Sequence, residues 1–134
     1  MSSNMRSERK KALLLVAHGS RRAASNDEIR ALARRLASNQ DNAFDRVEPA
    51  FLELAEPSIP DGIEVCIQQG ATEVLVFPYF LSAGRHVAED IPAEVRIKQD
   101  QHPEISIRIA DYLGVAAEMP GMILSHLQEQ TALA

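Results

Sequence analysis

Short apolar segments alternate with longer amphipathic segments along this chain, and the alternation limits the folds that it can adopt. Each apolar segment is too short for a helix and is predicted as a buried strand. The four strands are expected at about residues 12–17, 46–52, 73–79 and 106–110. A helical pattern follows each strand. Units of this kind predict an α/β fold that is flavodoxin-like, with a mostly parallel four-stranded sheet and helices on both faces.

Local signals set the expected helix boundaries and the order of the strands. The segment 25–28 (SNDE) has the spacing of a capping box and predicts the start of the first helix. The second helix is expected to begin near Ser58 and to end at Gly70. The third is expected over about 90–101, and the last begins near Pro120. Right-handed crossovers favour the strand order 2-1-3-4, with a topological switch point between strands one and three.

Length, charge and composition narrow the class of protein. A chain of 134 residues fits one domain, which we expect at 11–134 after a mobile polar tail at 1–10. The net charge of −5 argues against a nucleic-acid binder. No apolar run approaches a membrane span and no signal peptide is recognised, so we expect a cytoplasmic protein with no membrane partner. The single cysteine, Cys66, is interpreted as a core residue.

Three side chains with metal-ligand chemistry follow three of the predicted strands. His18 comes at the end of strand one, Glu53 at the end of strand two, and His86 in the loop after strand three. The carboxyl ends of parallel strands share one edge of a sheet, where ligands bind in open α/β folds. Two imidazoles and one carboxylate suit a divalent transition metal that keeps open positions for a substrate. The sequence therefore predicts that these residues converge at a metal site.

Each of these residues also has a simpler interpretation when it is taken alone. His18 could cap a turn, His86 could be an exposed loop residue, and Glu53 could sit at a helix N-terminus, favoured by the helix dipole. Their shared position at one edge favours the metal site. The other two histidines, His102 and His126, are expected to be structural or surface residues.

Three motifs resemble those of a known family. They are LVAHGSR at 15–21, AFLELAEPSI at 50–59 and VFPYFLSAGRHVAEDIP at 76–92. Over about residues 13–123, the chain resembles the small, single-domain form of the class II tetrapyrrole chelatases, the CbiX/SirB-type sirohydrochlorin chelatases. The resemblance implies a chelatase-like domain and a lyase that works without ATP or another nucleotide. Such a lyase inserts a divalent metal, cobalt or iron, into sirohydrochlorin or a related tetrapyrrole, for cobalamin or siroheme biosynthesis.

The same resemblance implies roles for individual residues. His18 and His86 carry over as the catalytic and metal-binding positions, with Glu53 as a further carboxylate of the metal site. Because a free imidazole titrates near neutrality, one histidine can accept a pyrrole proton while the other holds the ion. Co²⁺, Fe²⁺ and Ni²⁺ all accept such ligands, so the sequence leaves the metal open. The longer relatives carry two such domains in tandem, which implies that a single domain pairs as a homodimer.

The tetrapyrrole substrate that the resemblance implies is acidic, because sirohydrochlorin carries carboxylates around its rim. The expected substrate-binding residues lie beside the two histidines and are Ser20, Arg21, Arg22, Gly84 and Arg85. Guanidinium groups form paired hydrogen bonds with carboxylates. Backbone N–H groups around Gly19 and Ser20, near the next helix, would add donors.

Two other function classes stay open at this point. A non-catalytic carrier of metal or tetrapyrrole would use the same residues without turnover. An enzyme acting on a phosphorylated small molecule could hold its anion at Gly19-Ser20-Arg21. The chain lacks a G-x-G-x-x-G or G-x-x-x-x-G-K-[ST] pattern after the first strand, which argues against this second class.

Overall fold

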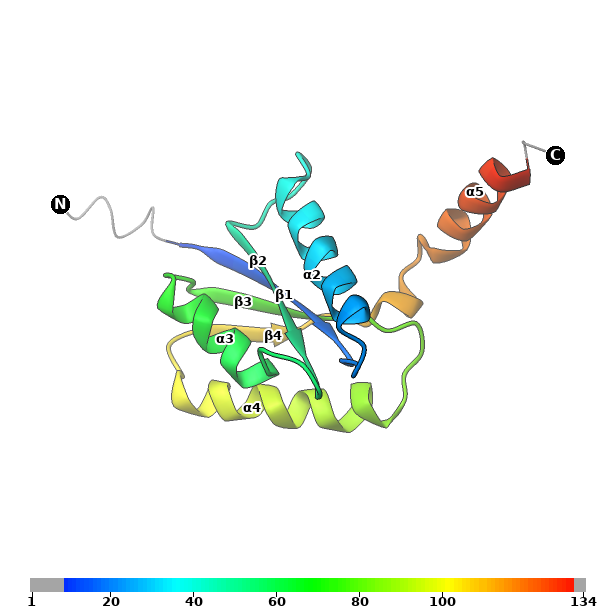
Figure 1. The fold of residues 1–134 in the computed structure, drawn as a ribbon. Helices are drawn as coiled ribbons and strands as arrows, with labels where there is room; N and C mark the ends of the chain where they lie inside the picture. The colour runs from blue at the N-terminus through cyan, green and yellow to red at the C-terminus, as the bar shows by residue number, and fades with distance from the viewer. Residues whose placement is uncertain (1–8, 132–134) are drawn as a thin grey trace.

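The sheet has four parallel strands in the order β2-β1-β3-β4, and this confirms the predicted fold class and strand order (Figure 1). The structure is a computed structural model that describes residues 9–131. The strands are β1 (Lys11–Ala17), β2 (Arg46–Phe51), β3 (Glu73–Pro78) and β4 (Ser106–Ile109). Because β1 is central and covered on both faces, its residues 12–17 are buried without interruption.

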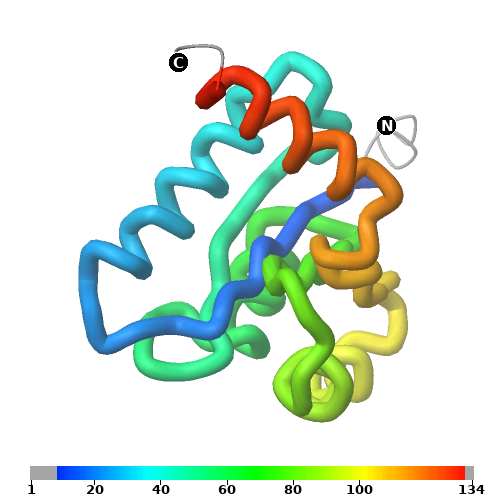
Figure 2. Tube along the Cα trace, turned by 90° about the vertical axis from the view of Figure 1, so that its right-hand side faces the viewer, coloured from blue at the N-terminus to red at the C-terminus, as the bar shows by residue number. Residues whose placement is uncertain are grey.

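Helices cover both faces of the sheet. On one face, α2 (Ala23–Ser38) packs against β2 and β1. On the other face, α3 (Ile59–Gln68) and α4 (Ile91–Gln101) pack against each other, with α3 next to β2 and α4 next to β4. The 3-10 turn η2 (Leu113–Val115) leads to the last helix, α5 (Met119–Thr131). In Figure 1, α2 lies above the strands and α4 lies below them, while α5 extends away from the sheet at the upper right; Figure 2 shows the same molecule turned by 90°.

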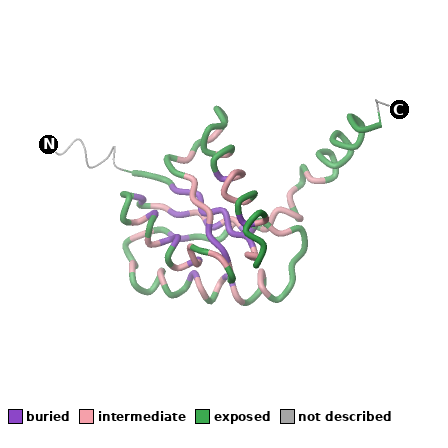
Figure 3. Tube along the Cα trace, viewed as in Figure 1, coloured by how far each residue is buried: buried purple, intermediate pink, exposed green. Residues whose placement is uncertain are grey.

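The hydrophobic core lies mainly between the sheet and the layer formed by α3 and α4 (Figure 3). Its buried members from these strands and helices include Leu14, Val16, Val74, Val76, Ile59, Ile63, Ile91 and Val95. Cys66 of α3 belongs to this core, and burial raises the pKa of its thiol to about 12. The thiol therefore stays protonated near neutral pH, which fits its interpretation as a core residue.

The amino-terminal end of the described chain is attached to the sheet. Residues 1–8 of the predicted mobile tail lie outside the described residues. Lys10 already belongs to the fold, since its N–H donates to Thr72 Oγ1 (3.1 Å) and its carbonyl oxygen accepts from Thr72 N–H (2.9 Å). Between residues 9 and 131, no helix has the length and apolar character that crossing a membrane requires.

One helix start differs from the sequence prediction, and another helix is preceded by an additional turn. α2 begins at Ala23, so Ser25 lies inside the helix and the predicted capping box is wrong. The physical reason is the buried side chain of Asn26, which accepts from Ser20 N–H (2.9 Å) and donates to the Ser20 carbonyl oxygen (2.8 Å). Before α4, a π-helical turn, η1 (His86–Asp90), runs directly into the helix. This turn was not predicted.

A polar network joins α3 to the end of α4. Glu64 of α3 accepts hydrogen bonds from Gln68 Nε2 (2.6 Å) and Lys98 Nζ (3.0 Å), and its Oε1 lies 2.9 Å from His102 Nε2. The bonds from Gln68, Lys98 and His102 lower the pKa of Glu64 from 4.5 to about 2. The ionised form of Glu64 is therefore favoured in the folded state. The place of His102 in this network fits its expected structural role.

We expect the substitution Glu64→Gln to lower stability at neutral pH and to flatten the response of stability to acid. In the native protein the contribution of Glu64 is complete above pH 4.5 and is lost as the pH falls toward 2. Urea unfolding followed by circular dichroism across this pH range measures both effects. The control Glu129→Gln, which removes an exposed carboxylate of α5, should leave the curve unchanged. Parallel pH curves for the native protein and Glu64→Gln would contradict the prediction.

Candidate functional site

The parallel sheet brings the three predicted ligand residues to one edge. His18 directly follows β1, Glu53 follows β2 by two residues, and His86 is the first residue of η1, after β3. β1 pairs with both neighbours up to its end, so the three carboxyl ends lie side by side. The convergence predicted from strand order is therefore present in the structure.

The two imidazoles meet at this edge, and each also contacts a carboxylate. The His18 and His86 ring centroids lie 4.6 Å apart, with the rings edge to face at 86°. His18 Nε2 lies 2.7 Å from Glu53 Oε2, and His86 Nδ1 lies 2.8 Å from Asp90 Oδ2. The two imidazole side chains are 43% and 42% exposed, so a ligand in solution can reach them. The site thus consists of two neighbouring imidazole–carboxylate pairs.

The backbone after β1 and β2 fixes the first of these pairs. Sheet-like pairing continues past both strands, since Leu52 N–H donates to the Ala17 carbonyl oxygen (2.9 Å) and Glu53 N–H to the His18 carbonyl oxygen (3.0 Å). Gly19 has a φ of +96°, and a Cβ there would lie 1.7 Å from the Glu53 carbonyl oxygen. Only glycine fits at this point, because the chain turns directly against Glu53.

A shallow depression of about 210 Å³ lies beside the second pair. Its lining is Leu52, Glu53, His86, Asp90, Ala93 and Glu94. Within residues 9–131, no three or more His, Cys, Asp and Glu side chains are arranged to hold a metal ion together. The predicted ligands of this site are instead hydrogen-bonded, His18 to Glu53 and His86 to Asp90. The arrangement offers exposed donors at an open edge and lacks the enclosed geometry of a structural metal site.

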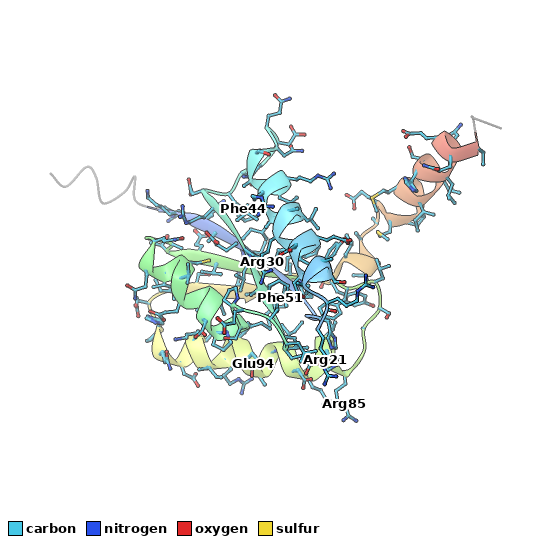
Figure 4. The ribbon with its side chains drawn as sticks, in the orientation of Figure 1. Arg21, Arg30, Phe44, Phe51, Arg85 and Glu94 are labelled. Carbon is cyan, nitrogen blue, oxygen red and sulfur yellow. The ribbon has the colours of Figure 1, made fainter. Side chains whose placement is uncertain are left out.

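The predicted substrate-binding arginines surround this edge and are exposed. Arg21 and Arg22 lie in the loop after His18, and Figure 4 shows Arg21 and Arg85 at the same end of the molecule. The Arg85 side chain is 80% exposed, and its only close carboxylate in the described part of the chain is Glu89, at 3.9 Å. Exposed pairs of this kind contribute little. The Arg85 guanidinium is therefore available to another anion.

Gly84 and Ser20 of the predicted substrate-binding set have different surroundings. A Cβ on Gly84 would meet no atom within 4 Å, so the backbone there is open to approach. The Ser20 N–H donates to Asn26, and the Ser20 hydroxyl accepts from Arg22 N–H (3.0 Å). The expectation that the Ser20 backbone N–H would donate to a bound anion is therefore wrong in this structure. Its hydroxyl hydrogen is the donor that Ser20 can offer.

Sequence reasoning missed two residues that organise the site. Asp90 contacts His86, and its spacing of four residues from His86 on a helical segment could have indicated the pair. Arg30 of α2 donates to the Glu56 carbonyl oxygen (2.9 Å) and lies over the Phe51 ring at 5.1 Å, which holds the loop that carries Glu53 (Figure 4). No local pattern points to Arg30, because its partners are brought to it by the fold.

The fold and this edge define a parallel α/β domain with an imidazole–carboxylate site. The family model described as CbiX matches residues 12–130, so the chain belongs to the CbiX family. This confirms the resemblance to the small class II chelatases. The chain is 33% identical over 118 residues to a sirohydrochlorin ferrochelatase of Priestia megaterium, covering 88% of this chain and 44% of that one.

Two solved structures are similar in fold. A CbiX protein of cobalamin biosynthesis from Marinobacter aquaeolei has a TM-score of 0.76 at 29% identity, over 92% of this chain and 99% of that one. The sirohydrochlorin chelatase SirB from Bacillus subtilis, in complex with cobalt, has a TM-score of 0.78 at 32% identity, over 90% of this chain and 50% of that one. The chain therefore spans about half the length of SirB and of the Priestia relative.

The substitution Gly19→Ala is expected to destabilise the protein by about 1–3 kcal/mol or more. A side chain in this left-handed conformation is strained, and its Cβ would displace the Glu53 backbone. Urea unfolding measures the loss. The matched control is Gly121→Ala in α5, where a Cβ meets no atom within 4 Å and a small gain of up to about 1 kcal/mol is expected. Equal stability of the two variants would contradict the close approach of Gly19 to Glu53.

Proposed function

We propose that this chain is a sirohydrochlorin chelatase, which inserts cobalt or iron into sirohydrochlorin or a closely related tetrapyrrole without ATP. The observation that carries the proposal is the meeting of His18 and His86, with their ring centroids 4.6 Å apart, at the edge where such folds bind ligands. Membership of the CbiX family and the names of the chelatase relatives support it. The metal ion is a substrate here and passes through the site.

In the proposed reaction, the two imidazoles have different roles, metal binding and proton acceptance. One imidazole holds the incoming ion through a ring nitrogen lone pair, and the other accepts a proton from a pyrrole nitrogen. Two pyrrole N–H bonds break and bonds from those nitrogens to the metal form, so two protons leave the macrocycle for each divalent ion. One goes to the free imidazole and the other to water, which reaches this exposed edge. Glu53, hydrogen-bonded to His18 at 2.7 Å, balances the positive charge that gathers at this edge.

We propose that the arginines bind the macrocycle and that the histidines bind the ion. Arg21 and Arg85 lie at the same end of the molecule, and Arg22 is an exposed neighbour (Figure 4). Charge-assisted hydrogen bonds from guanidinium groups to the rim carboxylates would fix the ring over the imidazoles. The Ser20 hydroxyl and the open backbone at Gly84 complete the proposed substrate-binding set.

We expect the substitutions His18→Ala and His86→Ala each to reduce metal insertion by about 100-fold or more, because each removes a ligand or proton acceptor. Incubation of sirohydrochlorin with Co²⁺, Fe²⁺ or Ni²⁺, followed by absorbance, measures insertion and identifies the preferred metal. Circular dichroism checks the fold, which should persist because both side chains are half-exposed.

The control for this experiment is His102→Ala, which removes an imidazole that binds Glu64 outside the site. Its insertion rate should stay close to that of the native protein. Native activity in either His18→Ala or His86→Ala would contradict the assignment. Stable binding of Co²⁺ or tetrapyrrole without formation of the metallated product would instead identify a carrier.

We also propose that the chain works as a homodimer, and the support comes from α5. No residue of this helix is buried, and its main contact is the turn η2. One side of α5 carries the exposed apolar side chains Ile123, Leu124 and Leu127, and the exposed Met122 lies at the margin of this side. Water disfavours a continuous apolar stripe of this kind, so a partner that covers it is favoured.

A second copy of this chain supplies a matching surface. Among residues 9–131, no helix packs on β3 and β4 on the α2 side of the sheet. A cavity of about 200 Å³ opens beside these strands and is lined by Lys11, Ala12, Ala43, Phe44, Glu73, Val74, Leu75 and Arg108. We propose that α5 of one subunit covers this surface on the other and that the exchange is reciprocal, as two-fold symmetry requires. The relatives of about double length are consistent with two such units.

Light scattering is expected to give twice the 14.8 kDa mass of one chain. The double substitution Ile123→Glu with Leu127→Glu places two charges on the apolar side of α5 and should shift the protein toward monomer. The matched control is Ser125→Glu with Gln128→Glu, which adds the same charges on the opposite side of the helix. A native monomer at working concentration, or an equal effect of the two pairs, would contradict this dimer.

A further inference from the structure

Asp90 lies at the end of the π-helical turn that begins with His86, and its carboxylate returns to that histidine. Asp90 Oδ2 is 2.8 Å from His86 Nδ1, and the two side chains are 44% and 42% exposed. The turn is closed by Ile91 N–H, which donates to the His86 carbonyl oxygen five residues earlier. Asp90 is thus held at the right distance by local backbone geometry.

Asp90 lies inside a continuous helical segment, because η1 runs directly into α4 and the Asp90 backbone is itself helical (φ −73°, ψ −43°). Its side chain forms no capping hydrogen bond with α4. Its carboxylate contacts His86 instead. The structure therefore commits this side chain to the imidazole and not to the helix.

The contact decides which nitrogen of His86 is available to a ligand. An ionised carboxylate only accepts hydrogen bonds, so Nδ1 must be the donor, and the lone pair of the neutral ring is then on Nε2. His86 Nε2 has no hydrogen-bond partner among residues 9–131, whereas His18 uses its Nε2 toward Glu53. The two imidazoles of the site are therefore not equivalent.

We propose that Asp90 is a positioning residue that holds His86 as the Nδ1–H tautomer and orients its Nε2 as the metal-binding atom. The inference rests on the proposed function. In metal sites a histidine commonly donates its other ring N–H to a carboxylate, which fixes the ring and raises the basicity of the ligating nitrogen. Asp90 then acts through His86 and does not coordinate the ion.

The first test reads the tautomer in the protein without metal. Nitrogen-15 NMR of the imidazoles, at a pH about two units above the ordinary histidine pKa of about 6.5, distinguishes protonated from unprotonated ring nitrogens. The native protein should show His86 protonated at Nδ1. Asp90→Ala should lose that preference, and Asp90→Asn should keep it, because its amide oxygen still accepts from Nδ1–H. An unchanged tautomer in Asp90→Ala would overturn the proposal.

The second test measures Co²⁺ binding by titration calorimetry on the full chain. Asp90→Ala should weaken binding by about 10- to 100-fold, as loss of such partners typically does, with Asp90→Asn in between. The apparent KM for Co²⁺ should rise while that for sirohydrochlorin stays constant. The control Glu94→Gln removes a carboxylate that lines the same depression, and Glu89→Gln removes one from the same turn. A loss in either control as large as in Asp90→Ala would indicate a general charge effect and overturn the proposal.

The variant His86→Ala separates this inference from the proposed function. If His86→Ala leaves Co²⁺ binding unchanged, the proposed metal site fails and the positioning role fails with it. If His86→Ala weakens Co²⁺ binding and Asp90→Ala does not, only the role of Asp90 fails. Circular dichroism of each variant, together with the isosteric Asp90→Asn, excludes loss of the fold as the cause.

Discussion

The backbone pairing of β1 with β2 and β3 is the constraint on which the rest of the site depends. β1 is bonded to both neighbours up to its carboxyl end, and the pairing with β2 continues until Glu53 N–H donates to the His18 carbonyl oxygen at 3.0 Å. Buried backbone groups must be paired, so this register cannot slip without cost. His18 and Glu53 therefore begin from fixed backbone positions. Only their half-exposed side chains are free to respond to a ligand.

The carboxylate partners of the two imidazoles come from different parts of the chain. Glu53 reaches His18 from the loop after β2, and Arg30 of α2 holds that loop through the Glu56 carbonyl oxygen. Asp90 belongs to the same turn as His86, so this pair depends on local geometry alone. A movement of the loop after β2 would alter the surroundings of His18 and leave the His86 pair intact. The fold therefore allows the two imidazoles to respond separately.

Features that follow from hydrophobic periodicity and strand order were predicted from the sequence. Features that follow from contacts made only in the folded chain were not. The short apolar runs and their alternation with helices indicated the parallel sheet, and that order placed His18, Glu53 and His86 at one edge. The capping-box pattern failed because Asn26 binds the Ser20 backbone and the helix starts earlier. The π-helical turn before α4 has no recognised sequence signal, and without it the pairing of Asp90 with His86 stayed hidden.

In the proposed reaction the metal ion is a substrate that must be released as well as bound, and the geometry of this edge suits both steps. Structural metal sites close around their ion with four ligands, whereas here the imidazoles are each hydrogen-bonded to a carboxylate at an open surface. Any ligand of His18 Nε2, whether an ion or a pyrrole proton, must first displace Glu53 from that nitrogen. The His18 and Glu53 side chains are 43% and 51% exposed, so water screens this bond. Exposed pairs typically contribute about 1 kcal/mol or less, so the displacement lowers the affinity by no more than roughly five-fold. Because the same bond can re-form as the ligand leaves, the pair of His18 and Glu53 would, in the proposed reaction, favour transfer of the metal to a macrocycle over its retention by the protein.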